Sequence, residues 1–276
     1  MDERLQRRVQ RYGWDKSAAR YEAYWREQLE PALARLLERA ACAEGERVLD
    51  VACGTGLASL PIAAAVGSSG EVLGVDLSER MVELARQGAE ERGLHHVRVE
   101  RMDAEALDVP DDSYDVVTCS LGLMYVPNVD RALGEMRRAL RPGGRAVASV
   151  WGPRATCGWA EIFPIVDARV SSEVCPMFFR LGNGDTLRWE MEAAGFEDVT
   201  LERLETHLLY PSADEACGAA LEGGPVALAA SRFDEQTTAD VRREYLASIE
   251  PFRAGEGYSI PAEFVIAVGY ARQDGT

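Results

Sequence analysis

Apolar residues recur every three or four positions in the first 41 residues, which is the spacing of one helical face. From residue 46 onward the pattern changes, and short continuous apolar runs alternate with longer segments in which apolar and charged residues are mixed. The short runs are typical of buried strands, and the mixed segments are typical of amphipathic helices. This alternation predicts an α/β fold whose parallel strands are covered by helices on both faces.

Strands and helices are predicted in regular succession between residues 46 and 151. The predicted strands are 47–52, 71–77, 97–102, 114–120 and 145–151. The predicted helices are 57–66, 78–92 and 129–140. Ser78 and Gly93 are residue types that favour the start and the end of a helix. We expect Pro142-Gly143-Gly144 to end the third helix.

The regular succession weakens after residue 151. Further helices are predicted at 159–170, 185–194, 212–221 and 234–249, and further strands at 199–207 and 263–270. We expect the last two strands to complete the sheet and the helices between them to cap a binding pocket. The chain then divides into an N-terminal helical lid (1–45), a core (46–151), and cap helices with the closing strands (152–276).

Composition and charge narrow the class of protein. The chain has 276 residues, 47% of them hydrophobic, which suits a packed globular protein. A formal net charge of −16 disfavours a nucleic-acid partner, because a polyanion would be repelled. The apolar run 57–66 is too short to cross a bilayer, and the charged segment 1–11 lacks the apolar stretch of a secretory signal. We therefore expect a cytoplasmic protein without membrane insertion.

The glycine-rich segment 48–56, Val-Leu-Asp-Val-Ala-Cys-Gly-Thr-Gly, joins a predicted strand to a predicted helix. Gly54 and Gly56 would let a ligand approach the backbone, and the helix start would attract a methionine-type carboxylate. Asp50 could face the ammonium group of the same ligand. A dinucleotide is disfavoured, since Ser59 replaces the third glycine of its fingerprint and Asp50 would repel a pyrophosphate.

Acidic residues follow the next two predicted strands. Asp76 ends the second strand, where such an acid meets both ribose hydroxyls of an adenosine ligand. Asp103 follows the third strand and could accept from an adenine amino group, while the N–H of Ala104 could donate to the ring. Leu77 and Met102 could hold the base between them. These positions predict an adenosine site at one edge of the sheet.

These motifs, in their order and spacing, resemble those of class I S-adenosylmethionine-dependent methyltransferases. The resemblance covers residues 46–151 and is nearest to the ubiquinone/menaquinone-biosynthesis group, also called type 11. It rests on segments 48–56, 74–78, 102–104 and 140–144. Ala52 departs from the pattern, because many members carry glycine there. The resemblance implies a Rossmann-like, seven-stranded, mostly parallel sheet whose last strand is antiparallel, and S-adenosylmethionine as the cofactor.

The expected cofactor site combines the motif residues with one ring of the lid. It comprises Asp50, Ala52, Gly54, Thr55, Gly56, Asp76, Leu77, Met81, Met102, Asp103, Ala104, Ser120 and Tyr21. The aromatic residues of the lid are Tyr12, Trp14, Tyr21, Tyr24 and Trp25. They are similar to family lids that fold over the cofactor, with Tyr21 as the best candidate. Equally, any one of these rings could simply pack a helix on the sheet.

The resemblance implies direct in-line transfer of a methyl group from a sulfonium, a reaction that needs alignment and a dry pocket. Segment 120–125, which follows the fourth predicted strand, should face that methyl group, and it lacks the Asn/Asp-Pro-Pro-aromatic signature of enzymes that methylate amino groups of bases. No metal ligand set and no catalytic base can be identified. The polar candidates for the pocket are Tyr125, Ser120, Tyr21 and His207.

Three functions remain open from the sequence. The first is methyl transfer to oxygen, nitrogen or carbon of a small, partly apolar metabolite. The second is methylation of trivalent arsenic by cysteines, for which the candidates are Cys42, Cys157, Cys175 and Cys217. The third is a non-catalytic S-adenosylmethionine-binding subunit. The expected partner is a small-molecule acceptor, and a homodimer remains open.

Overall fold

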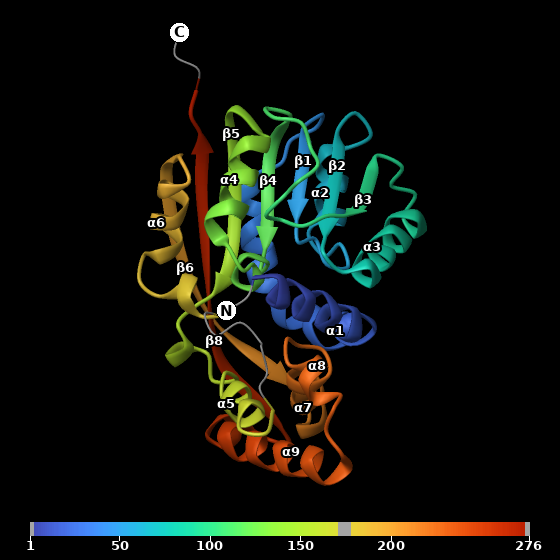
Figure 1. Cartoon of the computed structure of the whole chain (residues 1–276), viewed down its shortest axis with the longest axis vertical. Helices are drawn as coiled ribbons and strands as arrows, with labels where there is room; N and C mark the ends of the chain where they lie inside the picture. Colours follow the sequence, from blue (N-terminus) through green and yellow to red (C-terminus); the bar gives the residue numbers. More distant parts are fainter. Residues whose placement is uncertain (1–2, 171–177, 274–276) are drawn as a thin grey trace.

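A single long helix begins the fold. The computed structural model describes residues 3–170 and 178–273, and its first helix, α1, runs over Glu3–Ala40 with Pro31 inside it. Trp25, Leu29 and Leu36 lie on its buried face, as the apolar spacing predicts. In Figure 1 the N-terminal part of α1 lies just beyond the carboxyl ends of the central strands.

The core is one twisted mixed sheet with the strand order β3-β2-β1-β4-β5-β8-β6. Its first five strands are β1 (Arg47–Val51), β2 (Glu71–Asp76), β3 (Val97–Arg101), β4 (Tyr114–Ser120) and β5 (Leu140–Trp151). They are parallel, while β8 (Gly257–Ala271) lies antiparallel between β5 and β6 (Phe196–Tyr210). The predicted Rossmann-like sheet with its antiparallel last strand is confirmed. A two-residue strand, β7 (Arg253–Ala254), pairs with β8 and adds an eighth strand.

Helices cover both faces of the sheet and form a separate group beyond its end. They are α2 (Ser59–Val66), α3 (Glu79–Glu91), α4 (Val129–Ala139), α5 (Ile162–Asp167), α6 (Thr186–Ala193), α7 (Ala213–Leu221), α8 (Ala227–Ala230) and α9 (Glu235–Ile249). The Ser78 side chain accepts a hydrogen bond from the N–H of Met81 and so caps α3. Helices α5, α7, α8 and α9 gather where β6 and β8 extend past the parallel strands (Figure 1). None of the helices in the described ranges is long and apolar enough to cross a membrane.

The predicted boundaries of four elements need correction. Residues 142–144 do not form a turn that ends a helix, because α4 ends at Ala139 and β5 begins at once with Leu140. The pairing of β4 with β5 shifts register after Tyr114, which accommodates this irregular start. Only Ile162–Asp167 is α-helical within the predicted helix 159–170. Both late strands are longer than predicted, since β6 and β8 stay paired as far as Tyr210 and Tyr258, beyond the parallel sheet.

Candidate active site

A cavity opens at the carboxyl ends of the parallel strands, between α1 and the cap helices. It encloses about 940 Å³ of empty space, including its mouth. Residues at the ends of β1, β2, β4 and β5 line it, and α1 contributes Arg7, Gln10, Trp14, Tyr21, Trp25 and Leu29. This is the edge of an open α/β sheet where ligands bind.

The turn after β1 presents bare backbone to this cavity. Gly54 has φ +56°, and a Cβ built on it would meet no atom within 4 Å, so its free side faces open space. Ala52 and Leu121 also have positive φ, 57° and 55°, although neither is a glycine, and both line the cavity. Their left-handed conformation explains why glycine is common at position 52 in the family that the sequence resembles. The turns that follow the adjacent strands β1 and β4 therefore each contain a residue in a strained backbone conformation.

Asp76 lies at the end of β2 with its half-buried carboxylate against the glycine turn. One oxygen accepts from the N–H of Gly54 at 2.9 Å, and the other accepts from the N–H of Ser78 at 2.8 Å. Burial raises the pKa of this carboxyl group, and the two N–H donors oppose that shift. A carboxylate has about four acceptor positions, so Asp76 retains capacity for two hydroxyl groups of a ligand.

Asp50 is fully buried beneath the same turn. Its two oxygens accept from the Ser59 hydroxyl at 2.5 Å and the Thr118 hydroxyl at 2.7 Å, which ties β1 to α2 and β4. Burial raises its pKa to about 6. Asp50 and Thr55 border a smaller cavity beside the main one. The Thr55 hydroxyl is buried there and has no hydrogen-bond partner in the described part of the chain.

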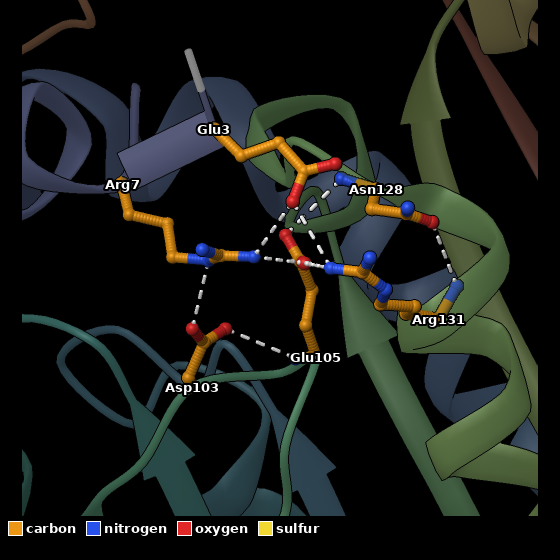
Figure 2. A network of polar contacts seen from close by, with 6 residues as sticks. All are labelled: Glu3, Arg7, Asp103, Glu105, Asn128 and Arg131. Carbon is orange, nitrogen blue, oxygen red and sulfur yellow. Dashed lines mark hydrogen bonds and ion pairs between the residues drawn. The ribbon is translucent and has the colours of Figure 1, made fainter. Parts of the chain in front are cut away.

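Asp103 lines the main cavity but is already paired. One carboxylate oxygen lies 3.0 Å from Nε of Arg7, and the other accepts from the N–H of Glu105. Arg7 also pairs with Glu105, a nearly buried carboxylate that accepts from the N–H of Asn128 at 3.1 Å. Figure 2 shows how this network joins the first turns of α1 to the segment after β3 and the start of α4. These contacts hold the first turns of α1 over one end of the cavity.

Aromatic rings make up the opposite, cap-side end, which we call the aromatic chamber and define by Trp25, Trp151, Trp159 and Tyr125. The ring centroids of Trp151 and Trp159 are 5.0 Å apart, and those of Trp25 and Trp151 are 6.0 Å apart. Trp14 packs edge-on against both Tyr21 and Tyr125. The cavity thus has a polar end by Asp76 and an apolar end formed by flat rings.

The structure brings most of the expected cofactor residues together. The main cavity is lined by Tyr21, Ala52, Gly54, Asp76, Leu77, Met81, Asp103, Ala104 and Ser120. Gly56 instead faces Leu60 and Ala85, and the half-buried Met102 side chain packs against the core. Of the remaining lid rings, Tyr24 packs on Gly218 and Tyr12 is exposed. Trp14, Tyr21 and Trp25 thus line the cavity, whereas Tyr12 and Tyr24 do not.

His207 does not reach the cavity. It is exposed on β6, where alternation along the strand turns its neighbour Leu208 into the core and His207 outward. Sequence reasoning also missed Arg7, Trp151 and Trp159 as lining residues. Trp151 ends a predicted strand at the ligand-binding edge, so the rule that selected Asp76 could have selected it. Arg7 and Trp159 carry no such signal.

Comparisons with known proteins place the core of the chain among methyltransferases in sequence. Residues 48–144 match a family model described as a methyltransferase domain. A demethylmenaquinone methyltransferase of Listeria welshimeri is 38% identical over 120 residues, which cover 44% of this chain and 51% of that protein. The chain thus spans about half the length of the curated relatives it matches.

Solved structures resemble the whole fold. The YcgJ protein of Bacillus subtilis has a TM-score of 0.62 at 21% identity, covering 89% of this chain and all of that one. Phosphoethanolamine N-methyltransferase 2 of Haemonchus contortus, solved with S-adenosyl-L-methionine, has a TM-score of 0.61 at 18% identity over 94% of this chain and 57% of that one.

The fold is Rossmann-like, and residues 48–144 match a methyltransferase domain. This part of the chain resembles class I S-adenosylmethionine-dependent methyltransferases, and the similarity extends to demethylmenaquinone methyltransferases over about half of their length. The cofactor of this class is S-adenosylmethionine.

Proposed function

We propose that this chain transfers the methyl group of S-adenosylmethionine to an oxygen, nitrogen or carbon atom of a small, partly apolar metabolite. The observation that carries the proposal is the shape of one continuous cavity, which joins the polar end at Gly54 and Asp76 to the aromatic chamber. A nucleoside suits the first end, and an apolar acceptor suits the second. The methyl group would pass between them, next to Ser120 and Tyr125.

The residues at the polar end fit the parts of the cofactor. Asp76 would hold the two ribose hydroxyls with its remaining acceptor positions. The backbone around Gly54 and the unpartnered Thr55 hydroxyl would meet the methionine portion. The base would lie near Leu77 and Ala104, on the side where Arg7 fastens the lid. Asp50 touches the smaller cavity, so its role toward the ammonium group stays a prediction.

In-line methyl transfer depends on alignment of the reactants and on exclusion of water more than on a catalytic base. Lid residues Trp14 and Tyr21 line the cavity, and burial raises the pKa of the Tyr21 hydroxyl, which keeps it neutral. A neutral ring beside a sulfonium adds cation–π attraction of about 0.5–2 kcal/mol. We assign none of the described groups as a general base, and in-line attack does not require one.

Methylation of arsenic finds no support in the described cysteines. Cys157 and Cys217 are buried, neither lines the cavity, and burial raises the pKa of each thiol to about 11, so both stay protonated near neutral pH. Cys42 has its pKa raised to about 11 as well. Cys175 lies outside the described residues. A non-catalytic subunit would have no use for an acceptor chamber, which favours a catalyst.

The name of the Listeria relative makes a demethylated menaquinone the first acceptor to test. Much of the chamber comes from residues beyond the matched range 48–144, among them Trp151 and Trp159. Cytoplasmic placement and a homodimer stay predictions from the sequence.

The experiment is a turnover assay with a panel of acceptors. The protein is incubated with S-adenosylmethionine labelled in its methyl group and with quinols, phenols and small amines in parallel. We expect S-adenosylhomocysteine to form together with a labelled product for an acceptor that combines a flat apolar body with a polar atom. Cofactor binding without turnover on any member of such a panel would favour the binding-subunit alternative.

A further inference from the structure

Gln10 is a polar residue on the face of α1 that covers the main cavity. It lines that cavity and is only 6% exposed. Its carboxamide makes no hydrogen bond within the described ranges, and neither its oxygen nor its nitrogen is fully enclosed. The surface that these atoms keep therefore opens into the cavity. A polar group that is buried this far without a partner in the protein is positioned to bind a ligand.

The neighbours of Gln10 on α1 place it at the polar end of the cavity. Arg7 lies three positions before it, and Nε of Arg7 is 3.0 Å from a carboxylate oxygen of Asp103 (Figure 2). Trp14 lies four positions after it and packs edge-on against Tyr125. Residues three or four apart on a helix are neighbours, with Cβ atoms about 5–6 Å apart. The Gln10 side chain therefore lies between the Arg7–Asp103 pair and the ring of Trp14.

One edge of an adenine base at this end of the cavity would still lack a partner. The sequence motifs predict that Asp103 meets the amino group at N6 and that the N–H of Ala104 meets the ring at N1. The amino group keeps a second hydrogen, and N7 beside it is an acceptor. A carboxamide offers the complementary acceptor and donor, and glutamine pairs with N6 and N7 of adenine in this way in nucleic-acid complexes. Arg7 cannot take this part, because a guanidinium only donates.

We propose that the Gln10 carboxamide binds the N6–N7 edge of the adenine of S-adenosylmethionine, accepting from the amino group and donating to N7. This inference rests on the proposed function and adds a residue that selects the base of the cofactor. Gln10 belongs to the same turns of α1 that Arg7 holds against Asp103 and Glu105. Recognition of the base is thereby linked to the position of the lid.

Two ligands that differ in one ring atom test this assignment. They are S-adenosylhomocysteine and its 7-deaza analogue, S-tubercidinylhomocysteine, in which a C–H group replaces N7 while N6 and N1 are kept. Isothermal titration calorimetry gives both affinities for the wild type, Gln10→Met and Gln28→Met. Gln28 is the matched control on the same helix, since its carboxamide already accepts from the N–H of Leu209 and donates to the carbonyl oxygen of that residue.

We expect the wild type to bind S-adenosylhomocysteine about tenfold more tightly than the 7-deaza analogue, which corresponds to about 1.4 kcal/mol. Gln10→Met should lose most of this preference, and Gln28→Met should keep it. Each ratio compares two ligands on one protein, so a change in the shape or stability of the lid affects both affinities and cancels. Gln10→Glu should lose the preference as well, because a carboxylate cannot donate to N7.

Equal affinity of the wild type for the two ligands would overturn the assignment. A preference that persists in Gln10→Met and Gln10→Glu would overturn it too, and that is the result expected if Gln10 binds the ribose instead of the base. Loss of the preference in Gln28→Met would show that any disturbance of α1 removes it, which also rejects the contact. Failure of the wild type to bind S-adenosylhomocysteine is a separate result, because it would reject the proposed function itself.

Discussion

Replacing Asp76 with alanine should weaken binding of S-adenosylmethionine by at least about 100-fold. The carboxylate would hold both ribose hydroxyls, and charge-assisted hydrogen bonds contribute about 1.5–3 kcal/mol each. Its two backbone partners, the N–H groups of Gly54 and Ser78, would lose their acceptor as well. Those bonds connect the glycine turn to the start of α3, so some loss of order in the turn adds to the effect. Isothermal titration calorimetry measures the affinity directly.

A matched control variant distinguishes the loss of the ribose contact from a general destabilisation of the start of α3. Asp15 accepts hydrogen bonds from the Ser78 hydroxyl at 2.6 Å and from the N–H of Arg80 at 3.2 Å, yet it does not line the cavity. We expect Asp15→Ala to lower the melting temperature while changing affinity less than tenfold. Equal losses of affinity in both variants would reject the assignment of Asp76 to the ribose.

Replacing Arg7 with methionine should release the first turns of α1. Arg7 bridges Asp103 and Glu105, and the Glu105 side chain is only 2% exposed (Figure 2). Without Arg7, Glu105 would still accept a hydrogen bond from the N–H of Asn128 and lie 3.6 Å from the Arg131 guanidinium. These two contacts would compensate its buried charge only in part. A loss of about 1–3 kcal/mol would speed amide exchange in residues 3–14 roughly five- to 150-fold.

The same change should weaken cofactor binding, because Gln10 and Trp14 line the cavity from this part of α1. Arg20→Ala is the control on the same helix. Arg20 pairs with Glu222 at 3.9 Å, and both side chains are more than half exposed, so its loss should leave exchange nearly unchanged. If Arg7→Met leaves exchange and affinity as they are in the wild type, the network is not what holds the lid.

Local patterns were enough to predict the parallel half of the fold. β4 begins and ends where the apolar run does, at Tyr114 and Ser120, and Ser78 caps α3 as its residue type suggests. The start of β5 could not be found this way. Pro142 and two glycines usually end an element, but here they lie in a gap in the pairing, which joins Tyr114 of β4 to Leu140 of β5 and then Val116 to Arg145, so β5 continues on both sides of them. Tertiary pairing overrode a local signal.

The candidate site was predictable where its residues belong to strand ends. Ala52, Gly54 and Asp76 follow from the alternation of strands and helices, because such an alternation brings the carboxyl ends of parallel strands to one edge. Trp159 and Arg7 lie in elements whose placement depends on packing across the chain, so nothing near them in the sequence marks them. The prediction that His207 lies in the pocket was wrong for a simpler reason. The face of β6 that His207 occupies is set by the register between β6 and β8.

The central claim is that the cavity between α1 and the strand ends binds S-adenosylmethionine. Calorimetric titration of the purified protein with S-adenosylmethionine, S-adenosylhomocysteine and NAD tests it most directly. We predict binding of the first two at one site per chain and no heat from NAD, because Asp50 disfavours a pyrophosphate and the third glycine of the dinucleotide fingerprint is Ser59. Tight binding of NAD, with no response to either sulfur-containing ligand, would contradict the account.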